Sequence, residues 1–564
     1  MMKQSKNRKG LWIIVIIVLF LLNFAASIFH QRIDLTNEKR FTLTKPVKNL
    51  LNNIKEPVQI LIFLNGSLPS GFKKLENSTK DMLQEFKERS HGNVHFKFVS
   101  ADEKIGETNR SYADTLASLG VAPINLKVQL KQGEQSQYVY CAALVQSNNK
   151  WEVANLYTGP PAINKEEVNA SESMLEYQFA SALQRTMTMH RPMIAYATGN
   201  DEPAGDNVYD LIENVLKKNY SLFTMNLQEE PVIPDTFKLM IIVKPTIGFS
   251  DQQKLKIDQY VMHGGKLLMF TDRLEAEMDS LQLKNQVVAY DRNLQLEDLL
   301  FKFGVRINPD LVMDLQSDFL PFSVNGKEQF EFLHWNYFPL FESAQNSPIN
   351  KNLGLVAGKF VNSIDTVASP GIQKTILLHS STNSRTIEAP ALISGEENKN
   401  SPDNAAYNKK NIPVAVLLEG RFTSLYKNRI GGQQQDSLSF YGSPFLTENV
   451  EENKMIIVSD GDIVLNATYK NQPLPMGVNP YTIGSQYEYQ FANRQFLENC
   501  IEYLINEGGL MEAKSKNFTL RLLDPKKVAD EKNLWQMINL AVPVVLLLLF
   551  GFIFQFVRKK KYAV

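Results

Sequence analysis

Residues 239–270 read LMIIVKPTIGFSDQQKLKIDQYVMHGGKLLMF. Short apolar runs open and close this stretch, and such runs are typical of strands that are buried on both faces of a parallel sheet. Between the runs, Ser250 and Asp251 can cap the start of a helix and the Gly264–Gly265 pair can end it. The stretch therefore predicts a strand over 239–243, a helix over 251–263 and a strand over 266–270.

The same alternation of strands and helices extends on both sides of this unit. Further strands are predicted over 192–198 and 454–458, and further helices over 209–217 and 493–506. The residues from about 311 to 448 are instead irregular and β-rich, and they contain a polar, low-complexity loop at 395–411 that we expect to be mobile. We therefore expect an α/β domain over 191–510 with a β-rich insertion at about 311–448.

A smaller α/β domain is predicted over 57–160. Its elements, in chain order, are a strand over 57–64, a helix over 72–89, a strand over 94–99, a helix over 112–119 and strands over 124–130, 138–145 and 151–156. The order β-α-β-α-β-β is that of a thioredoxin-like sheet, and Ala122–Pro123 stands where that fold places a cis-proline. No Cys-x-x-Cys occurs, which excludes thiol redox chemistry, so we expect a scaffold. A connecting helix is expected within 161–190.

Two apolar runs bracket these domains. Residues 11–29 are broken only by Asn23 and Ser27, and residues 540–557 contain Gln555 as their one clearly polar member. Each run nearly spans a ~30 Å hydrocarbon core as a helix. Lysines and arginines precede the first run and follow the second, so the positive-inside rule places both termini in the cytoplasm and the bulk of the chain in the periplasm of a bacterial inner membrane. A cleaved signal peptide is the alternative for the first run.

These runs divide the remainder of the chain. The expected segments are a cytoplasmic tip at 1–10, a membrane helix at 11–30, a membrane-proximal segment at 31–56, a linker at 511–532, a second membrane helix at 533–557 and a basic cytoplasmic tail at 558–564. Four residues are candidates for helix packing within the membrane: Asn23, Asn539, Pro543 and Gly551. An Asn against another helix can gain a hydrogen bond there, and Pro543 frees a carbonyl that a neighbour could satisfy.

Composition narrows the class of function. The 60 basic and 60 acidic residues cancel, and no block of basic and aromatic residues lies outside the two tips, so nucleic acid is not an expected partner but membrane lipid is. No His-Glu-x-x-His motif, cysteine cluster or Gly-x-Ser-x-Gly elbow occurs, so we expect no metal, no cofactor and no catalytic residue. Cys141 and Cys500 are expected to be buried and unpaired.

Six polar residues follow the predicted parallel strands and are candidates for ligand binding: Asn200, Asp201, Glu202, Asp272, Asp460 and Asp462. Ligands of open α/β sheets bind in the crevice outside these strand ends, and five acidic groups there could suit a cation or a cationic ligand. The alternative is structural, because Asx and Gly residues also terminate strands and cap helices. We favour the structural interpretation.

Several stretches together resemble one protein family. They are 32–43 (RIDLTNEKRFTL), 64–72 (LNGSLPSGF), 257–268 (IDQYVMHGGKLL), 415–429 (AVLLEGRFTSLYKNR), 521–524 (RLLD) and 539–543 (NLAVP). The chain is similar to the GldG family of gliding-motility-associated proteins, membrane-anchored periplasmic subunits of an ABC transporter. The resemblance implies a permease partner (GldF), a cytoplasmic ATPase partner (GldA) and a central domain related to type 1 glutamine amidotransferase-like folds. The nucleophilic Cys of those enzymes has no counterpart after any predicted strand.

We therefore expect a non-enzymatic, membrane-anchored periplasmic subunit that couples a permease and an ATPase to an envelope or gliding-machinery partner. Two alternatives stay open. The first is a solute-binding protein whose ligand lies in the strand-end crevice of the central domain. The second is a degenerate amidotransferase-like hydrolase.

Overall fold

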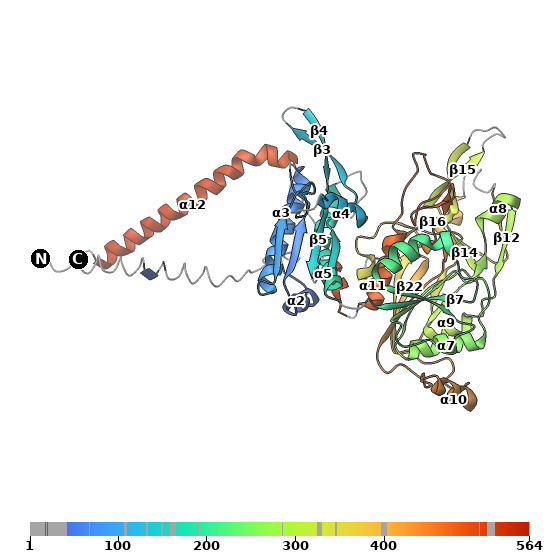
Figure 1. Cartoon of the computed structure of the whole chain (residues 1–564). Coiled ribbons are helices and arrows are strands. Elements are labelled where there is room, and N and C mark those ends of the chain that lie inside the picture. The colour runs from blue at the N-terminus through green and yellow to red at the C-terminus, as the bar shows by residue number, and fades with distance from the viewer. Residues whose placement is uncertain are drawn as a thin grey trace. The chain divides into compact units, whose positions relative to one another are not determined.

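The fold is taken from a computed structural model (Figure 1). It describes residues 17, 18, 20, 42–66, 68–106, 110–130, 133–147, 150–157, 165–188, 191–284, 286–323, 330–344, 347–395, 403–506, 508–515 and 525–562. The chain forms two compact units, residues 1–516 and residues 517–564, and each is treated by itself.

A mixed sheet of ten strands is the centre of the first unit. Five of its strands run parallel in the order β23-β10-β9-β7-β8. They are β7 (Met193–Thr198), β8 (Ser221–Asn226), β9 (Leu239–Val243), β10 (Lys266–Phe270) and β23 (Asn453–Val458). Four of the five were predicted from sequence, and β8 was missed because its exposed Phe223 and Thr224 break the apolar pattern.

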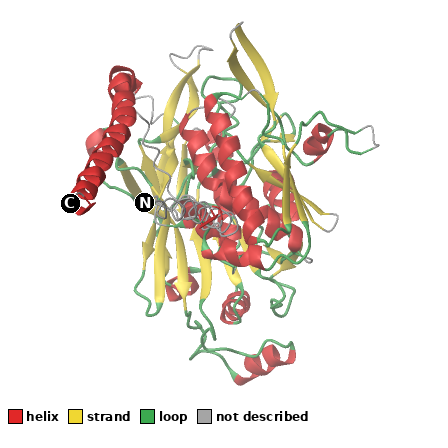
Figure 2. Ribbon diagram, turned by 90° about the vertical axis from the view of Figure 1, so that its left-hand side faces the viewer, coloured by secondary structure: helices red, strands yellow, loops and turns green. Residues whose placement is uncertain are grey.

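Helices cover both faces of these strands (Figure 2). Buried side chains of α7 (Asp251–Met262) and α9 (Glu297–Phe303) share one apolar cluster with the sheet, and those of η2 (Asp210–Leu216) and α11 (Asn493–Ile505) share another. Ser250 caps α7 as predicted, in a reciprocal pair with Gln253. The α/β prediction for this part of the chain is confirmed.

The β-rich residues after 311 do not fold as a separate insertion. Their long strands continue the central sheet in antiparallel fashion, in the order β22-β19-β16-β15. These strands are β15 (Ser317–Ser323), β16 (Phe330–Ser343), β19 (Ile372–His379) and β22 (Pro413–Gly420), with β17 (Val356–Ala357) beside β16. The parallel and antiparallel halves are thus one sheet, because β22 pairs directly with β23.

Smaller elements surround this sheet. They are β11 (Leu274–Glu275), α8 (Met278–Lys284), β12 (Gln286–Asp291), β13 (Val305–Ile307), β14 (Asp310–Asp314), η3 (Pro348–Asn350), β18 (Ile364–Thr366), β20 (Ser384–Glu388), β21 (Ala391–Ser394), η5 (Asn404–Ala406), α10 (Gly432–Phe440), η6 (Asp462–Val464), β24 (Thr468–Tyr469) and β25 (Gln472–Pro473), with η1 (Gly205–Val208) and α6 (Lys217–Asn219) on either side of η2. Part of the predicted mobile loop, 396–402, lies outside the described residues.

The N-terminal part of the unit has a four-stranded sheet in the order β2-β1-β5-β6, with β1 and β2 parallel and the other pairs antiparallel. Its elements are α2 (Lys45–Asn52), β1 (Val58–Ile62), α3 (Ser70–Arg89), β2 (Val94–Phe98), α4 (Tyr112–Ser118), β5 (Ala142–Ser147), β6 (Lys150–Asn155), α5 (Lys165–Met187) and a separate hairpin of β3 (Ile124–Leu130) with β4 (Gly133–Val139). Among the described residues the cis peptide bond is Ala389–Pro390, so the prediction of a cis bond at Ala122–Pro123 is wrong.

Cys141 and Cys500 are buried and free, as predicted. The start of the predicted linker 511–532 is instead part of a core: η7 (Leu510–Ser515) buries Leu510, Met511 and Ala513 among residues of α2 and α5. Local sequence could not show this return, because the partners are more than 300 positions away.

The second unit contains α12 (Pro525–Tyr562), with Pro543 inside the helix. The most apolar 18-residue window within residues 534–560 of α12 has a mean hydropathy of 2.7, and none of that window is buried, so this helix is long and apolar enough to cross a membrane. Asn539 and Gly551 lie on it with exposed surfaces. Asn23 and most of the first apolar run lie outside the described residues.

Candidate functional site at the strand ends

The strand order places the six candidate residues along one edge of the sheet. The chain passes from β7 outward to β8 and then returns to β9, β10 and β23 on the other side of β7. This order has its topological switch point between β7 and β9, where α/β proteins most often bind ligands. Four of the candidates belong there to two groups, which we call the amide bridge and the ionic cluster.

The amide bridge is centred on Asn200, which is fully buried just beyond β7. Its side-chain amide donates to the carbonyl oxygens of Ile247 and Gly248, both at 3.2 Å, and its Oδ1 accepts from Nε2 of Gln253 at 2.8 Å. Its main-chain carbonyl accepts from the amide of Thr246 at 3.0 Å. Asn200 therefore joins the loops that follow β7 and β9 at the switch point, the place where a ligand would otherwise lie.

Asp201 and Glu202 lie beside the amide bridge but are not part of it. Asp201 is exposed, has a φ of +63°, and accepts a hydrogen bond from the Thr246 hydroxyl. Glu202 is nearly buried, and its Oε2 accepts from the amide of Asn200 at 2.8 Å. Its Oε1 has no hydrogen-bond partner, and burial raises the pKa of this carboxyl above its usual range. Both residues shape the turn after β7.

The ionic cluster is centred on Lys244, the first residue after β9, whose side chain is 8% exposed. Its ammonium lies 2.7 Å from Oδ2 of Asp462, 3.4 Å from Oδ2 of Asp272 and 3.3 Å from Oε1 of Glu277. Arg292 pairs with the same Glu277 oxygen at 2.6 Å. The cluster thus connects the carboxyl ends of β9, β10 and β23 through charge-assisted hydrogen bonds.

Main-chain amides hold the carboxylates of this cluster in place. The amide of Gly461 donates to Oδ1 of Asp272 at 2.6 Å, and the amides of Lys359 and Asp462 donate to the two oxygens of Asp460 at 2.9 and 2.7 Å. Gly461 approaches so closely that a Cβ there would lie 2.5 Å from Cβ of Lys244. A larger residue at 461 would force the strand ends apart.

The four ionisable side chains at the centre differ in their pKa values. Burial raises the pKa of Asp460 well above its usual range, with Asp462 and Asp272 acting in the same direction. Burial also raises the pKa of Asp272, to about 6. Burial opposes ionisation of Asp462, but Lys244 and Lys359 outweigh it and lower the pKa. The carboxylates likewise outweigh burial at Lys244 and raise its pKa.

Within the described residues, oxygens of Asp272, Asp460 and Asp462 lie within 4.8 Å of one another, close enough to hold a metal ion. The ammonium of Lys244 already supplies a positive charge to two of these carboxylates. The donor set therefore fits an internal ion pair network better than a metal site, since a metal would lie close to the lysine and be repelled by it.

The sequence predicted Asp272, Asp460 and Asp462 of this cluster but not Lys244, Glu277 and Arg292. A signal for Lys244 was present, because it directly follows the apolar strand 239–243 as the acids follow their strands. Glu277 and Arg292 gave no such signal, since both follow strands that are too short or too exposed to be recognised by pattern.

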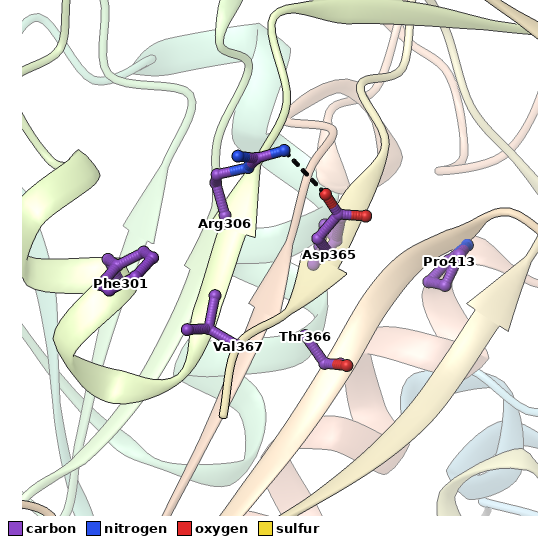
Figure 3. Close-up of a pocket in the computed structure, with 7 residues that line it drawn as sticks. Phe301, Arg306, Asp365, Thr366, Val367 and Pro413 are labelled. Carbon is purple, nitrogen blue, oxygen red and sulfur yellow. Dashed lines mark hydrogen bonds and ion pairs between the residues drawn. The ribbon is translucent and has the colours of Figure 1, made fainter. Parts of the chain in front are cut away.

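Two hollows on the described residues lie away from these groups. One of about 460 Å³ is lined by Phe301, Arg306, Ile364, Asp365, Thr366, Val367 and Pro413 (Figure 3). The Arg306 guanidinium points toward Asp365 there and pairs with it at 2.9 Å, with both side chains more than half exposed. The other, of about 620 Å³, is lined by Glu56, Pro57, Val58, Gln59, His95, Gln146 and Ser147. None of the six candidate residues lines either hollow.

Two solved structures resemble this chain weakly. They are an mmIFT52 N-terminal domain (TM-score 0.30, 12% identity, covering 55% of this chain and 96% of that one) and the exo-beta-1,4-mannosidase Op5Man5 from Opitutaceae bacterium strain TAV5 (TM-score 0.18, 10% identity, covering 68% and 44%). Neither likeness is close enough to support a functional argument.

Sequence comparisons are more informative. An uncharacterized protein of Borreliella burgdorferi is 20% identical over 570 residues, which cover 99% of this chain and 100% of that protein. Residues 37–146 match a domain of unknown function, DUF7088. Residues 191–500, more than half of the chain and the part that contains both strand-end groups, match a family described as an ABC-type uncharacterized transport system. The chain therefore belongs to this family of ABC-type transport components.

Proposed function

We propose that the chain is a non-enzymatic, membrane-anchored periplasmic subunit of an ABC transporter complex, acting with a permease and a cytoplasmic ATPase. Membership of the transport family supports an accessory role in transport. The observation that carries the non-enzymatic part is the state of the strand ends. The amide bridge closes the switch point, and Lys244 neutralises the acids that could otherwise attract a cationic ligand.

The anchoring part of the proposal rests on the apolar helix α12 and on the first apolar run at 11–29. With basic residues at both ends of the chain, two membrane helices would leave both termini in the cytoplasm and residues 31–532 in the periplasm. Asn23, Asn539, Pro543 and Gly551 would then pack against permease helices. A single anchor with a cleaved N-terminal segment is the alternative, and reporter fusions after residue 9 distinguish the two.

Two finer assignments of fold belong to the same proposal. The strand order β2-β1-β5-β6, with one parallel and two antiparallel pairs, supports a thioredoxin-like scaffold, although Ala122–Pro123 lacks the expected cis bond. The parallel strands of the central domain support a distant relation to amidotransferase-like folds. Cys500 is fully buried inside α11 and burial raises its pKa, so it is poorly suited to act as a nucleophile.

The decisive experiment is purification of the tagged chain from membranes in mild detergent, followed by identification of the proteins that copurify. We expect a permease and an ATPase in fixed ratio to the chain. The resemblance to gliding-motility proteins suggests GldF-like and GldA-like partners, and deletion of the gene is then expected to abolish gliding. Recovery of the chain alone would contradict the proposal.

The solute-binding and hydrolase alternatives predict different results in the same preparation. A solute-binding protein would retain a small molecule, detectable by mass spectrometry after denaturation, and Asn200→Ala would release it. A hydrolase would turn over amide substrates, and no single substitution among the strand-end residues would then be neutral. We expect neither a retained solute nor turnover.

A further inference from the structure

The C-terminal strap, residues 508–515, connects the central domain to the N-terminal domain. It follows α11 and then buries Leu510, Met511 and Ala513 in the same apolar cluster as Val47 of α2 and Phe179 of α5. Part of the N-terminal core is therefore supplied by the segment that leads toward the second apolar helix.

Two consecutive residues of α5 hold the two ends of the folded unit. Oε1 of Glu176 accepts hydrogen bonds from the amide and the hydroxyl of Thr44, at 2.6 and 2.9 Å. The ammonium nitrogen of Lys514 lies over the ring of Tyr177, 4.1 Å from the ring centroid. Thr44 follows the first apolar run in sequence and Lys514 precedes the second. Gly509 also lies beside Pro46, since a Cβ at 509 would be 3.5 Å from the proline ring. Both covalent connections to the apolar runs therefore start from one place on α5.

Lys514 also contacts the central domain. Its ammonium donates to Oδ1 of Asn499 in α11 at 2.5 Å, and Nδ2 of Asn499 donates to the main-chain carbonyl of Ile349 at 2.6 Å. The side chain of Lys514 thus lies between Tyr177 of the N-terminal domain and Asn499 of the central domain. It is the point at which strap, α5 and α11 meet.

This lysine is buried without a close counter-ion. Lys514 is 3% exposed, and among the described residues no carboxylate oxygen lies within 4.0 Å of its ammonium. Glu498 and Glu502 of α11 stabilise its charge only from a distance, and burial lowers its pKa to about 8. A buried ammonium of this kind is costly unless it is paired, and the closed junction is therefore less stable than one filled by an apolar side chain.

Among the described residues, two side-chain hydrogen bonds also join the domains, and Tyr503 of α11 packs against the apolar clusters of both. Asn352 donates to the hydroxyl of Ser173 at 3.0 Å, and Asn506 donates to Oε1 of Gln184 at 3.0 Å. Water can replace such hydrogen bonds at little cost, and inter-domain contacts of this type commonly open and close.

We propose that the strap 508–515 is a movable joint, in which the buried ammonium of Lys514, lying between the N-terminal and central domains without a close counter-ion, leaves their closed state poised to open when the segment leading to the C-terminal apolar helix is displaced. This inference rests on the proposed membrane anchoring. It gives the protein a means to convert a movement of a membrane partner into a movement between its two periplasmic domains.

The test is amide hydrogen exchange on the full-length chain in lipid nanodiscs, comparing the wild type with Lys514→Met. Methionine fills the same space without the charge and so removes the cost of burying that charge. We therefore expect exchange at 508–515 and 170–187 to slow by about tenfold or more, because a pKa shift of one unit corresponds to a tenfold change in an equilibrium constant. Lys454→Met is the matched control, because Lys454 also lies over a ring, 4.3 Å from that of Tyr503, but within the central domain alone. Equal or faster exchange in a folded Lys514→Met chain overturns the joint.

A second variant decides the question if Lys514→Met does not fold. Gln184→Cys with Asn506→Cys places thiols on either side of the joint, while the native cysteines are buried. Reaction with a short bis-maleimide is expected to slow exchange at 508–515 by about tenfold or more. Unchanged exchange after cross-linking refutes the joint.

The same readout separates this inference from the proposed function. If a permease and ATPase copurify, addition of ATP is expected to accelerate exchange at 508–515 in the wild type and not in the cross-linked chain. No ATP response in an intact complex overturns the coupling role. If no partner copurifies, the proposed function fails, and the exchange data on the chain alone still decide whether the joint exists.

Discussion

The two strand-end groups close the same edge of one sheet by different means. At the β7–β9 switch point a neutral amide, Asn200, makes hydrogen bonds to two loops and leaves no charge to balance. Beyond β9 a buried ammonium, Lys244, lies among Asp272, Asp462 and Glu277. The first group needs only shape and hydrogen bonds, whereas the second places opposite charges beside one another in a buried site.

This difference shows why acidic residues at strand ends are ambiguous evidence for a ligand site. Asp272 and Asp462 resemble ligands for a cation when only the sequence is considered, and in the folded chain a lysine from the neighbouring strand supplies that cation. Substitutions in the two groups can test this difference.

Lys244→Met is expected to have the largest effect. It leaves Asp272 and Asp462 buried without their nearest cation. Removing one partner of a buried ion pair typically lowers the free energy of unfolding by about 3–5 kcal/mol. The loss is measured as faster hydrogen exchange at the amides of β9, β10 and β23. Lys254→Met is the control, since Lys254 is also buried but pairs with the more exposed Asp251 and Asp298. Equal losses for the two variants would show that the ionic cluster has no special importance.

Asn200→Ala is expected to have an intermediate effect and to lower the free energy of unfolding by about 1–3 kcal/mol. The reason is that it leaves the Gln253 side-chain amide and two loop carbonyls without this hydrogen-bond partner. The loss should be confined to exchange at β7 and at residues 246–253. Asn219→Ala, which removes a single hydrogen bond to Val215, serves as the control. If both variants lose the same free energy of unfolding, the amide bridge contributes no more to stability than one ordinary hydrogen bond.

The pH dependence of stability should distinguish the ionic cluster from the amide bridge. Burial raises the pKa of Asp272 to about 6 from 3.8, so between these values the folded chain binds more protons than the unfolded chain. The stability that this group contributes is complete below pH 3.8 and is lost as pH rises through about 6, by about 3 kcal/mol or less.

This dependence is measured as the difference between urea unfolding midpoints of the wild type and Asp272→Asn at pH 4 to 7. We expect the stability of Asp272→Asn to increase relative to that of the wild type as pH rises through 6. A constant difference would mean that Asp272 does not titrate in this range. Asn200→Ala, which removes no titratable group, should show the same pH profile as the wild type.

Asp201→Asn is expected to have the smallest effect, about 0.5 kcal/mol or less, because Asp201 is exposed and an asparagine oxygen can still accept from Thr246. Permease copurification and exchange at β7 are the measurements. Loss of transport-complex function with unchanged exchange would favour a ligand at the switch point and therefore the solute-binding alternative.

The sequence predicted best where the determining residues are close together. The unit β9-α7-β10 was predicted within one residue at each end, because its apolar runs, the Ser250 cap and the glycine stop all act over a few positions. The parallel neighbours β7 and β23 followed from the same pattern. The sequence could not show that β22 pairs with β23, so the predicted insertion is in truth a continuation of the sheet.

What the sequence determined by itself is therefore the local alternation of strands and helices, the apolar run that forms α12, and the presence of acids after buried strands. The role of those acids follows from the folded arrangement, because Asp462 meets its lysine 218 positions away in the chain. The tertiary structure also decided that residues 510–514 belong to the N-terminal core and that Lys514 lies between two domains. The physical reason is the same in each case: pairing of charges and burial of apolar groups depend on distance in space, which short-range sequence patterns do not encode.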